Sequence, residues 1–301
     1  MIEQETVAIL GLGLIGGSLA RDLSMRGTRV LGYDRDAEQV RAAFNVRAIS
    51  GVIGEDLEAL RSASIVVLAV PVDVAPALLE RASPFLGAAE LITDVGSTKL
   101  VIGERASKLG VRDRFVGAHP MAGDSRAGFA ASRPGLFTGS RVYLCPSSRS
   151  EPPAKTKALK LWHAVGADVR WTTAEEHDGE VAFTSHLPHL LSAALARTIA
   201  TAGHDVAALG TGGREMTRLA GSSPAMWQAI VSTNHAAIVR ALAACASQLD
   251  QVRELVARKD HTSVARLFEE SGEWLRAAPA DAAPENKAPR KKARGASGIT
   301  G

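Results

Sequence analysis

The chain has 301 residues, a length typical of two domains that each bury a core of their own. Its composition, with 46% apolar and 22% charged residues and two cysteines, excludes disordered proteins, fibrous proteins and small disulfide-stabilised scaffolds. The net charge of +3 arises at the end of the chain, where residues 278–301 carry five basic and two acidic side chains. We therefore expect a neutral globular body, no nucleic-acid partner and a disordered basic tail over residues 278–301.

The cysteines and the apolar segments indicate the cellular compartment. Cys145 and Cys245 lie far apart in apolar surroundings, and the N-terminus has no charged segment followed by an apolar one. The apolar stretch at 190–196 is bounded by His189 and Arg197, so it is too short to cross a membrane. We expect a cytoplasmic protein with reduced cysteines and no membrane partner.

Short β-branched runs alternate with helical stretches in the first part of the chain. The predicted strands are Thr6–Leu10, Arg29–Tyr33, Ile65–Ala69, Leu91–Thr93, Phe115–Gly117, Arg141–Leu144 and Asp168–Trp171. Alternation of this kind predicts a parallel sheet that is covered by helices on both faces. Residues 1–173 are therefore predicted to form an α/β Rossmann domain with a doubly wound, mainly parallel sheet.

Residues 174–277 have no strand pattern and are rich in Ala, Leu, Arg and Glu at helical spacing. Helix breaks are expected near Gly203, Gly210–Gly213 and Pro224. This part is predicted to be an all-α domain. The segment Ile230–Leu249 is too apolar for one small bundle to bury on all sides, which predicts a homodimer formed through the helices.

A glycine-rich turn follows the first predicted strand. Gly11, Gly13 and Gly16 have the spacing of the dinucleotide-binding fingerprint, and Leu14 and Ile15 begin the helix after it. The first glycine permits the tight turn, the second lets the backbone approach a pyrophosphate, and the third lets the helix pack closely on the strand. The N–H groups and the dipole of the helix N-terminus favour bound phosphates.

An acidic residue follows the second predicted strand. Asp34, 21 residues after Gly13, is placed to accept hydrogen bonds from ribose hydroxyls. Its carboxylate would repel a 2′-phosphate, which predicts NAD as the cofactor. Arg35 beside it can pair with such a phosphate, so the choice between NAD and NADP stays open.

Two polar loops follow later strands, at the carboxyl edge where doubly wound sheets bind ligands. The first loop, residues 94–99, contains Ser97, although Ser97 or Thr98 could instead cap the helix that follows. The second loop, residues 117–123, contains His119 between two glycines that leave the imidazole accessible. A histidine in such a position is suited to proton transfer.

The helical part adds a second set of polar residues. It contains His177, and Arg214 and Arg218 are four residues apart on one predicted helix face. Two guanidinium groups suit a substrate with carboxylates, and the alternative is a solvated face paired with acids such as Glu215.

A metal site is a further possibility for the histidines of this part. His186 and His189 have a spacing that a metal site could use. No acidic or cysteine partner recurs at ligand spacing, so no metal is expected.

Taken together, these motifs resemble the prephenate dehydrogenase family, including its arogenate and cyclohexadienyl variants. The matching pieces are residues 11–18, 94–99, 117–123 and 185–189, and then Thr217-Arg218 followed by Trp227. They occur in the family's order, which makes the set far more specific than any one piece. The resemblance implies a Rossmann domain followed by a helical domain that dimerises.

The resemblance also implies an activity, the NAD-dependent oxidative decarboxylation of prephenate to 4-hydroxyphenylpyruvate in tyrosine biosynthesis. It implies that His119 accepts the proton of the substrate C4 hydroxyl and that Ser97 orients this hydroxyl. Arg218 matches the arginine that binds the ring carboxylate, and Arg214 lies near the same substrate. His189 matches a histidine near the pyruvyl side chain.

One position departs from the family pattern. Many members carry a glutamate shortly after the second loop, where this chain has Asp124 and then Ser125. Gating or selectivity that depends on this glutamate is therefore in doubt. The remaining pocket is predicted to be cationic, which favours prephenate over the zwitterionic side chain of arogenate.

Three alternatives differ from this interpretation. An arogenate dehydrogenase would share the fold and differ in the α-amino group of its substrate. A β-hydroxyacid dehydrogenase would need a lysine acid in the helical part, and none occurs between Trp171 and Lys259. A non-catalytic NAD-sensing module would keep Asp34 and the glycines without the sites at Ser97 and His119.

Overall fold

The computed structural model describes residues 2–124 and 126–277. These residues form two compact units, the first ending at Leu242 and the second beginning at Ala243. The predicted basic tail and Ser125 lie outside the described residues. The predicted boundary between residues 173 and 174 stays a prediction.

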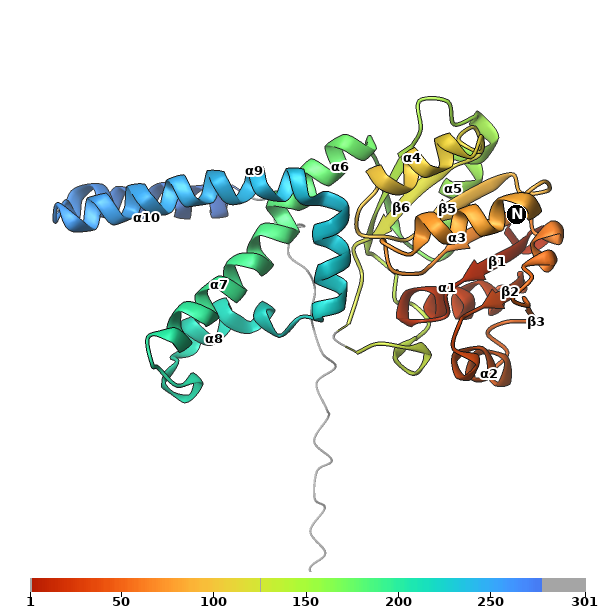
Figure 1. Ribbon diagram of the computed structural model, residues 1–301, viewed down its shortest axis with the longest axis horizontal. Helices are drawn as coiled ribbons and strands as arrows, with labels where there is room; N and C mark the ends of the chain where they lie inside the picture. The colour runs from red at the N-terminus through yellow and green to blue at the C-terminus, as the bar shows by residue number, and fades with distance from the viewer. Residues whose placement is uncertain (1, 125, 278–301) are drawn as a thin grey trace, which may run out of the picture. The chain divides into compact units, whose positions relative to one another are not determined.

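The first unit begins with a five-stranded parallel sheet, in the order β3-β2-β1-β4-β5 (Figure 1). Its strands are β1 (Thr6–Leu10), β2 (Arg29–Tyr33), β3 (Gly51–Val52), β4 (Ile65–Leu68) and β5 (Leu91–Asp94). All four residues of β4 are buried, because helices cover both faces of the sheet. The strands predicted for this sheet are confirmed to within one residue at their ends, and β3 was not predicted.

A second sheet of three strands continues the fold, in the order β6-β7-β8. Its strands are β6 (Val116–Pro120), β7 (Arg141–Pro146) and β8 (Asp168–Trp171). The strand β6 runs antiparallel to β7, whereas β7 and β8 are parallel. A single bridge between Ile92 and Phe115 connects the two sheets, which gives the mainly parallel arrangement that was predicted.

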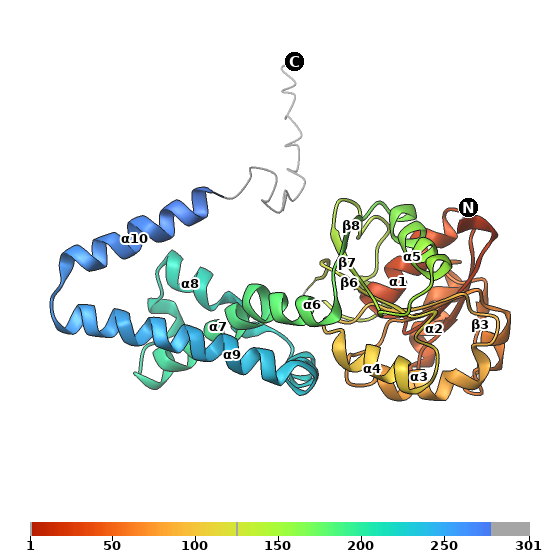
Figure 2. The same ribbon diagram turned by 90° about the horizontal axis from the view of Figure 1, so that it is seen from above.

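Helices pack on both faces of these sheets, as Figure 2 shows for α3 and α4 on one side and α5 on the other. The helices are α1 (Leu14–Ser24), α2 (Ala37–Asn45), α3 (Ala75–Ala82), α4 (Leu100–Lys108) and α5 (Pro152–Ala164). Val7 and Ile9 belong to the core with α1 and α5, while Ala8 and Leu10 belong to the core with α3 and α4. This alternation follows from the two-residue period of a strand, and it confirms the doubly wound fold.

After β8 the described chain is helical. Its helices are α6 (Ala174–Val181), α7 (Leu187–Thr201), α8 (Thr211–Thr217), α9 (Pro224–Ala257) and α10 (His261–Arg276). A π-helical turn, Ala182–His186, lies between α6 and α7, and α9 is kinked at Asn234. The break predicted over Gly210–Gly213 is wrong in part, because α8 begins directly after Gly210 and includes the other two glycines.

Candidate active site

The turn after β1 has the close contacts that explain its glycines. Gly11 has φ +108°, and a Cβ on it would lie 2.2 Å from the carbonyl oxygen of Ala69. A Cβ on Gly16 would lie 1.9 Å from the carbonyl oxygen of Gly11, so only glycine lets α1 pack here. A Cβ on Gly13 would meet nothing within 4 Å, so this part of the turn faces open space. No side chain caps α1 at Gly13, which leaves its first N–H groups for an anion.

A carboxylate lies against the same turn. Asp34 follows β2, and its Oδ2 accepts from the Leu12 N–H at 2.7 Å while its Oδ1 accepts from the Asp36 N–H at 3.0 Å. Leu14 and Ile15 begin α1 and are partly exposed. An open turn, an uncapped helix N-terminus and a carboxylate at the next strand end together fit a bound dinucleotide.

A buried ion pair connects the two loops that the sequence singled out. Lys99 and Asp94 are 2% and 1% exposed, and the Lys99 ammonium donates to Asp94 and, at 2.7 Å, to the Ala118 carbonyl oxygen. The Asp94 carboxylate also accepts from the Gly96 N–H at 2.9 Å. Burial raises the pKa of Asp94, and the Lys99 ammonium opposes this shift. The pair therefore holds the first loop against β6.

His119 lies inside β6, so the prediction that it stands on a loop is wrong. The strand extends to Pro120 because it pairs with β7, where His119 is opposite Tyr143. Alternate side chains of a strand point to opposite faces, and Ala118 is buried in the core while His119 is partly exposed. The Nδ1 of His119 is 2.8 Å from the Nε2 of His177 in α6, with the ring planes at 76°.

The surroundings keep His119 uncharged. Burial lowers the pKa of His119 well below the ordinary value of 6.5, and the nearby His177, Lys99 and His186 act in the same direction. A neutral imidazole can accept a proton at neutral pH. Because Nδ1 faces His177, Nε2 is the nitrogen that remains for a ligand.

The N-terminus of α4 is capped from the helical part of the unit. The N–H groups of Lys99 and Leu100 donate to the two carboxylate oxygens of Asp178, at 2.8 and 3.0 Å. The alternative that Ser97 or Thr98 caps this helix is therefore wrong, because a carboxylate from α6 occupies that position. Ser97 is partly exposed at the end of the loop, where its hydroxyl can meet a ligand.

His186, His189 and Trp227 gather on the helical side. Burial lowers the pKa of His186 to about 4. His189 bonds through Nδ1 to the Ser185 carbonyl oxygen at 2.9 Å, and its ring centroid is 5.0 Å from that of Trp227. The ring of His186 meets the same indole at 5.9 Å. Within residues 2–124 and 126–277, no group of three His, Cys, Asp or Glu residues is placed to hold a metal.

Arg214 and Arg218 do not share one continuous α-helix, contrary to the prediction. The helix α8 ends at Thr217, and Arg218 begins a 3₁₀ turn over Arg218–Gly221. With two glycines among its seven residues, α8 has a low intrinsic helix stability. Both arginines are exposed, and Arg214 donates from Nε to the Leu209 carbonyl oxygen at 2.9 Å.

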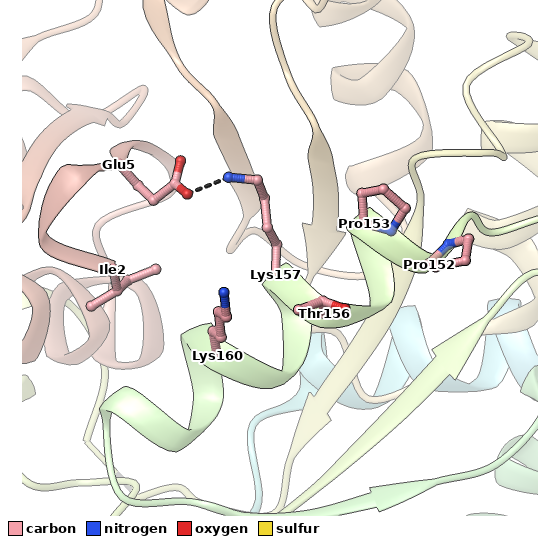
Figure 3. A pocket seen from close by; sticks show the side chains of 7 residues that line it. All are labelled: Ile2, Glu5, Pro152, Pro153, Thr156, Lys157 and Lys160. Atoms are coloured by element: carbon pink, nitrogen blue, oxygen red, sulfur yellow. Dashed lines mark hydrogen bonds and ion pairs between the residues drawn. The ribbon is translucent and has the colours of Figure 1, made fainter.

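A hollow elsewhere in the unit lies between α5 and the N-terminal segment (Figure 3). It is lined by Ile2, Glu5, Pro152, Pro153, Thr156, Lys157 and Lys160. Lys157 is ion-paired with Glu5 and lies 3.6 Å from Glu90. The residues predicted to bind nucleotide or substrate are not among its lining, so this hollow and the His119 site are different places.

Two family models match consecutive parts of the chain. Residues 19–171 match the nucleotide-binding domain of prephenate dehydrogenase, and residues 173–270 match its dimerization domain. The chain belongs to the prephenate dehydrogenase family. It is therefore an oxidoreductase of this family. Asp34 lies within the residues that match the nucleotide-binding domain, and the glycine turn comes directly before them.

Individual relatives agree with this family. The prephenate dehydrogenase of Bacillus subtilis (strain 168) is 32% identical over 279 residues, 90% of this chain and 75% of the relative. The structure of Synechocystis arogenate dehydrogenase is 30% identical with a TM-score of 0.79, covering 89% of this chain and 98% of that one. The structure of A. aeolicus prephenate dehydrogenase with hydroxyphenyl propionate and NAD⁺ is 27% identical with a TM-score of 0.83, covering 89% and 96%. These similarities confirm the predicted fold.

The sequence analysis does not predict a role for Asp178 or for the Lys99–Asp94 ion pair. The one feature of the sequence that points to Asp178 is its position directly after His177 in one predicted helix. Their burial could not be predicted, because it depends on a loop 79 residues earlier in the chain that packs on them.

Proposed function

We propose that this protein is an NAD-dependent prephenate dehydrogenase that forms 4-hydroxyphenylpyruvate and CO₂ in tyrosine biosynthesis, and that it acts in the cytoplasm. The observation that carries the proposal is the pair of His119 and His177, 2.8 Å apart, which leaves Nε2 of a neutral His119 as a base at the carboxyl end of β6. Asp34 favours NAD because its carboxylate would repel a 2′-phosphate. The A. aeolicus relative, whose structure contains NAD⁺, agrees with this choice.

The residues of the first part would hold the cofactor. The turn of Gly11, Gly13 and Gly16 and the first N–H groups of α1, at Leu14 and Ile15, suit the pyrophosphate, and Asp34 suits a ribose. When bound, NAD⁺ accepts the hydride that leaves C4 of the substrate ring.

The remaining steps belong to side chains near β6 and α8. As the hydride leaves, Nε2 of His119 takes the proton of the C4 hydroxyl, and the ring carboxylate departs as CO₂. The ring thereby becomes aromatic, and His119 returns the proton to the phenolate oxygen. In this proposal Ser97 orients the hydroxyl and Arg218 binds the ring carboxylate. Arg214 lies near the same substrate, and His189 lies near the pyruvyl side chain.

We expect the purified protein to reduce NAD⁺ with prephenate, and to have a higher kcat/KM for prephenate than for arogenate. Asp124, which follows the second loop, is bonded to Arg126 at 2.8 Å and to Arg133 at 3.1 Å, and Arg126 holds its pKa well below the usual range. This carboxylate is already paired and offers little to an α-ammonium group. NADH absorbance with each substrate, and with NADP⁺ in place of NAD⁺, measures both preferences. Absence of reduction with either substrate would refute the proposed function, and a preference for arogenate would refute the assignment of substrate.

Removal of the exposed guanidinium at position 218 tests the substrate contact. We expect Arg218→Ala to raise KM for prephenate by about 10- to 100-fold, because an ionic hydrogen bond contributes about 1.5–3 kcal/mol. Arg218→Lys keeps the charge without the bidentate geometry and should lie between. Arg253→Ala, which removes an arginine with a 75% exposed side chain from α9, serves as the matched control. A change in NAD⁺ affinity alone would show that Arg218 contacts the cofactor and not the substrate.

We also propose a homodimer formed through the helical part. In α9 and α10 several large apolar side chains are exposed, among them Leu249, Val256, Phe268, Trp274 and Leu275. By length and composition α9 could also cross a membrane. Burial of these side chains against a second copy of the chain is favoured over burial in a membrane, because residues 173–270, which include α9, match a dimerization domain.

Light scattering is expected to give twice the 31.5 kDa mass of one chain at micromolar concentration. The double variant Phe268→Glu/Trp274→Glu should shift this mass toward one chain, because both side chains are more than 70% exposed within one copy. Met25→Glu, at a similarly exposed position of the first unit, should not. A monomeric wild-type mass would contradict the homodimer.

A further inference from the structure

His119 is the first member of a chain of three buried or partly buried groups. Its Nδ1 lies 2.8 Å from Nε2 of His177, and Nδ1 of His177 lies 2.7 Å from Oδ1 of Asp178. The side chains of His177 and Asp178 are 0% and 1% exposed. Water is therefore excluded from His177 and Asp178. Both ring nitrogens of His177 must then find their hydrogen-bond partners in His119 and Asp178.

The direction of the hydrogen bonds follows from the end of the chain. The Asp178 carboxylate accepts from the N–H groups of Lys99 and Leu100, at 2.8 and 3.0 Å, so both of its oxygens act as acceptors. An ionised carboxylate can only accept, so His177 donates from Nδ1. The Nε2 of a neutral His177 then carries a lone pair, and His119 must donate to it from Nδ1. Nε2 of His119 is thereby left unprotonated.

We infer that His177 and Asp178 are positioning residues that fix the tautomer of His119, so that its Nε2 presents a lone pair to the substrate hydroxyl. This inference rests on the proposed function and adds residues to it. After proton transfer, the positive His119 keeps its Nδ1–H bond to His177, so the ring keeps its orientation through that step. No proton moves to Asp178.

Asp178 also fixes the position of α4 in the same site. By accepting from the first N–H groups of α4, it holds the helix that begins three residues after Ser97. On the other side, the Asn234 side chain donates to the Asp178 carbonyl oxygen at 2.9 Å, at the kink of α9. One residue thus sets the position of α4 and the orientation of the histidine pair.

The test begins with Asp178→Asn, which keeps the shape and replaces one acceptor by a donor. Oδ1 of Asp178 accepts from both His177 and the Lys99 N–H, so the tautomer reverses where the amide N–H₂ takes the place of Oδ1. The His177 ring then donates from Nε2, and His119 must carry its proton on Nε2, where it cannot act as a base. We expect kcat to fall about 10²- to 10⁴-fold, with KM for prephenate and NAD⁺ within about threefold. Asp22→Asn is the matched control, because Asp22 is also buried and accepts at 2.8 Å from the backbone N–H of Gly135.

Two substitutions at position 177 give an independent comparison. His177→Gln can present a carbonyl oxygen to Nδ1 of His119, whereas His177→Leu cannot. We therefore expect the glutamine variant to retain more of kcat than the leucine variant. Equal losses in two folded variants would show that His177 only fills space.

Ring ¹⁵N chemical shifts read the tautomer directly and need no catalysis. In the wild-type protein the signals that disappear in His119→Asn should report a protonated Nδ1 and a bare Nε2, and Asp178→Asn should reverse them. A bare Nδ1 in the wild type, or a folded Asp178→Asn whose shifts show the reversed tautomer and whose kcat stays within threefold of wild type, would overturn the inference. Failure of the wild type to oxidise prephenate or arogenate would instead overturn the proposed function, while the shifts would still test the tautomer.

Discussion

Replacing His119 with asparagine should lower kcat with prephenate by about 10²–10⁴, the usual contribution of a well-placed general base. Asparagine can still donate to Nε2 of His177, so the pair keeps its contact while the site loses the nitrogen that takes the proton. The glycine turn and Asp34 are untouched, so NAD⁺ affinity should stay within about twofold. Steady-state kinetics and NADH fluorescence titration measure the two quantities.

The exposed His163 of α5 provides the control for this prediction, since His163→Asn makes the same change away from the site. The wild-type pH profile adds a second check. The pKa of His119 is held below 6.5, so the base stays deprotonated and active at pH 6.5, and the acidic decline of kcat should fall below that value. Unchanged kcat in His119→Asn would show that another group takes the proton.

Replacing Lys99 with methionine should lower the free energy of unfolding by about 3–5 kcal/mol, because it leaves a buried carboxylate without its counter-charge. Asp94 is 1% exposed and would keep its bond from the Gly96 N–H but lose the ammonium. Urea denaturation of Lys99→Met measures the loss. Lys108→Met, an exposed lysine on α4, should cost far less.

The buried charge can be isolated in two ways. In the double variant Asp94→Asn/Lys99→Met no charge is buried, so its loss of stability should be smaller than that of Lys99→Met. Lower pH should also reduce the loss of stability in Lys99→Met, because the buried Asp94 carboxylate then takes up a proton. The pKa of this carboxyl is raised in the folded state and is about 3.9 in the unfolded state. The deficit should therefore be larger at pH 7 than at pH 5. A deficit that does not change with pH would assign the loss to packing.

The parallel strands were predictable because they are apolar on both faces. The runs Thr6–Leu10 and Arg29–Tyr33 are continuous and bounded by turn residues, and the structure forms them with these bounds. Gly51–Val52 was missed because two residues carry no periodicity. The end of β6 was misplaced because Pro120 indicates a loop by its local preference, whereas β6 is an outer strand of its sheet, where proline is tolerated.

The candidate site was predictable in its parts and not in its connections. The spacing of Gly11, Gly13 and Gly16 and the position of Asp34 are local features, and the structure places them around one turn. The contact of His119 with His177 joins residues 58 positions apart, and no local pattern contains it. The same is true of Asp178, whose role depends on which surface α6 meets.

The histidine pair has a consequence for the motions of the molecule. His119 belongs to a strand of the nucleotide-binding part and His177 to a helix that follows it, so the pair exists only while the two are docked. A brief separation of these layers would leave the dinucleotide turn intact and release the imidazole to rotate. Binding of the cofactor and the orientation of His119 are thus separate properties, and only the second depends on the contact between β6 and α6.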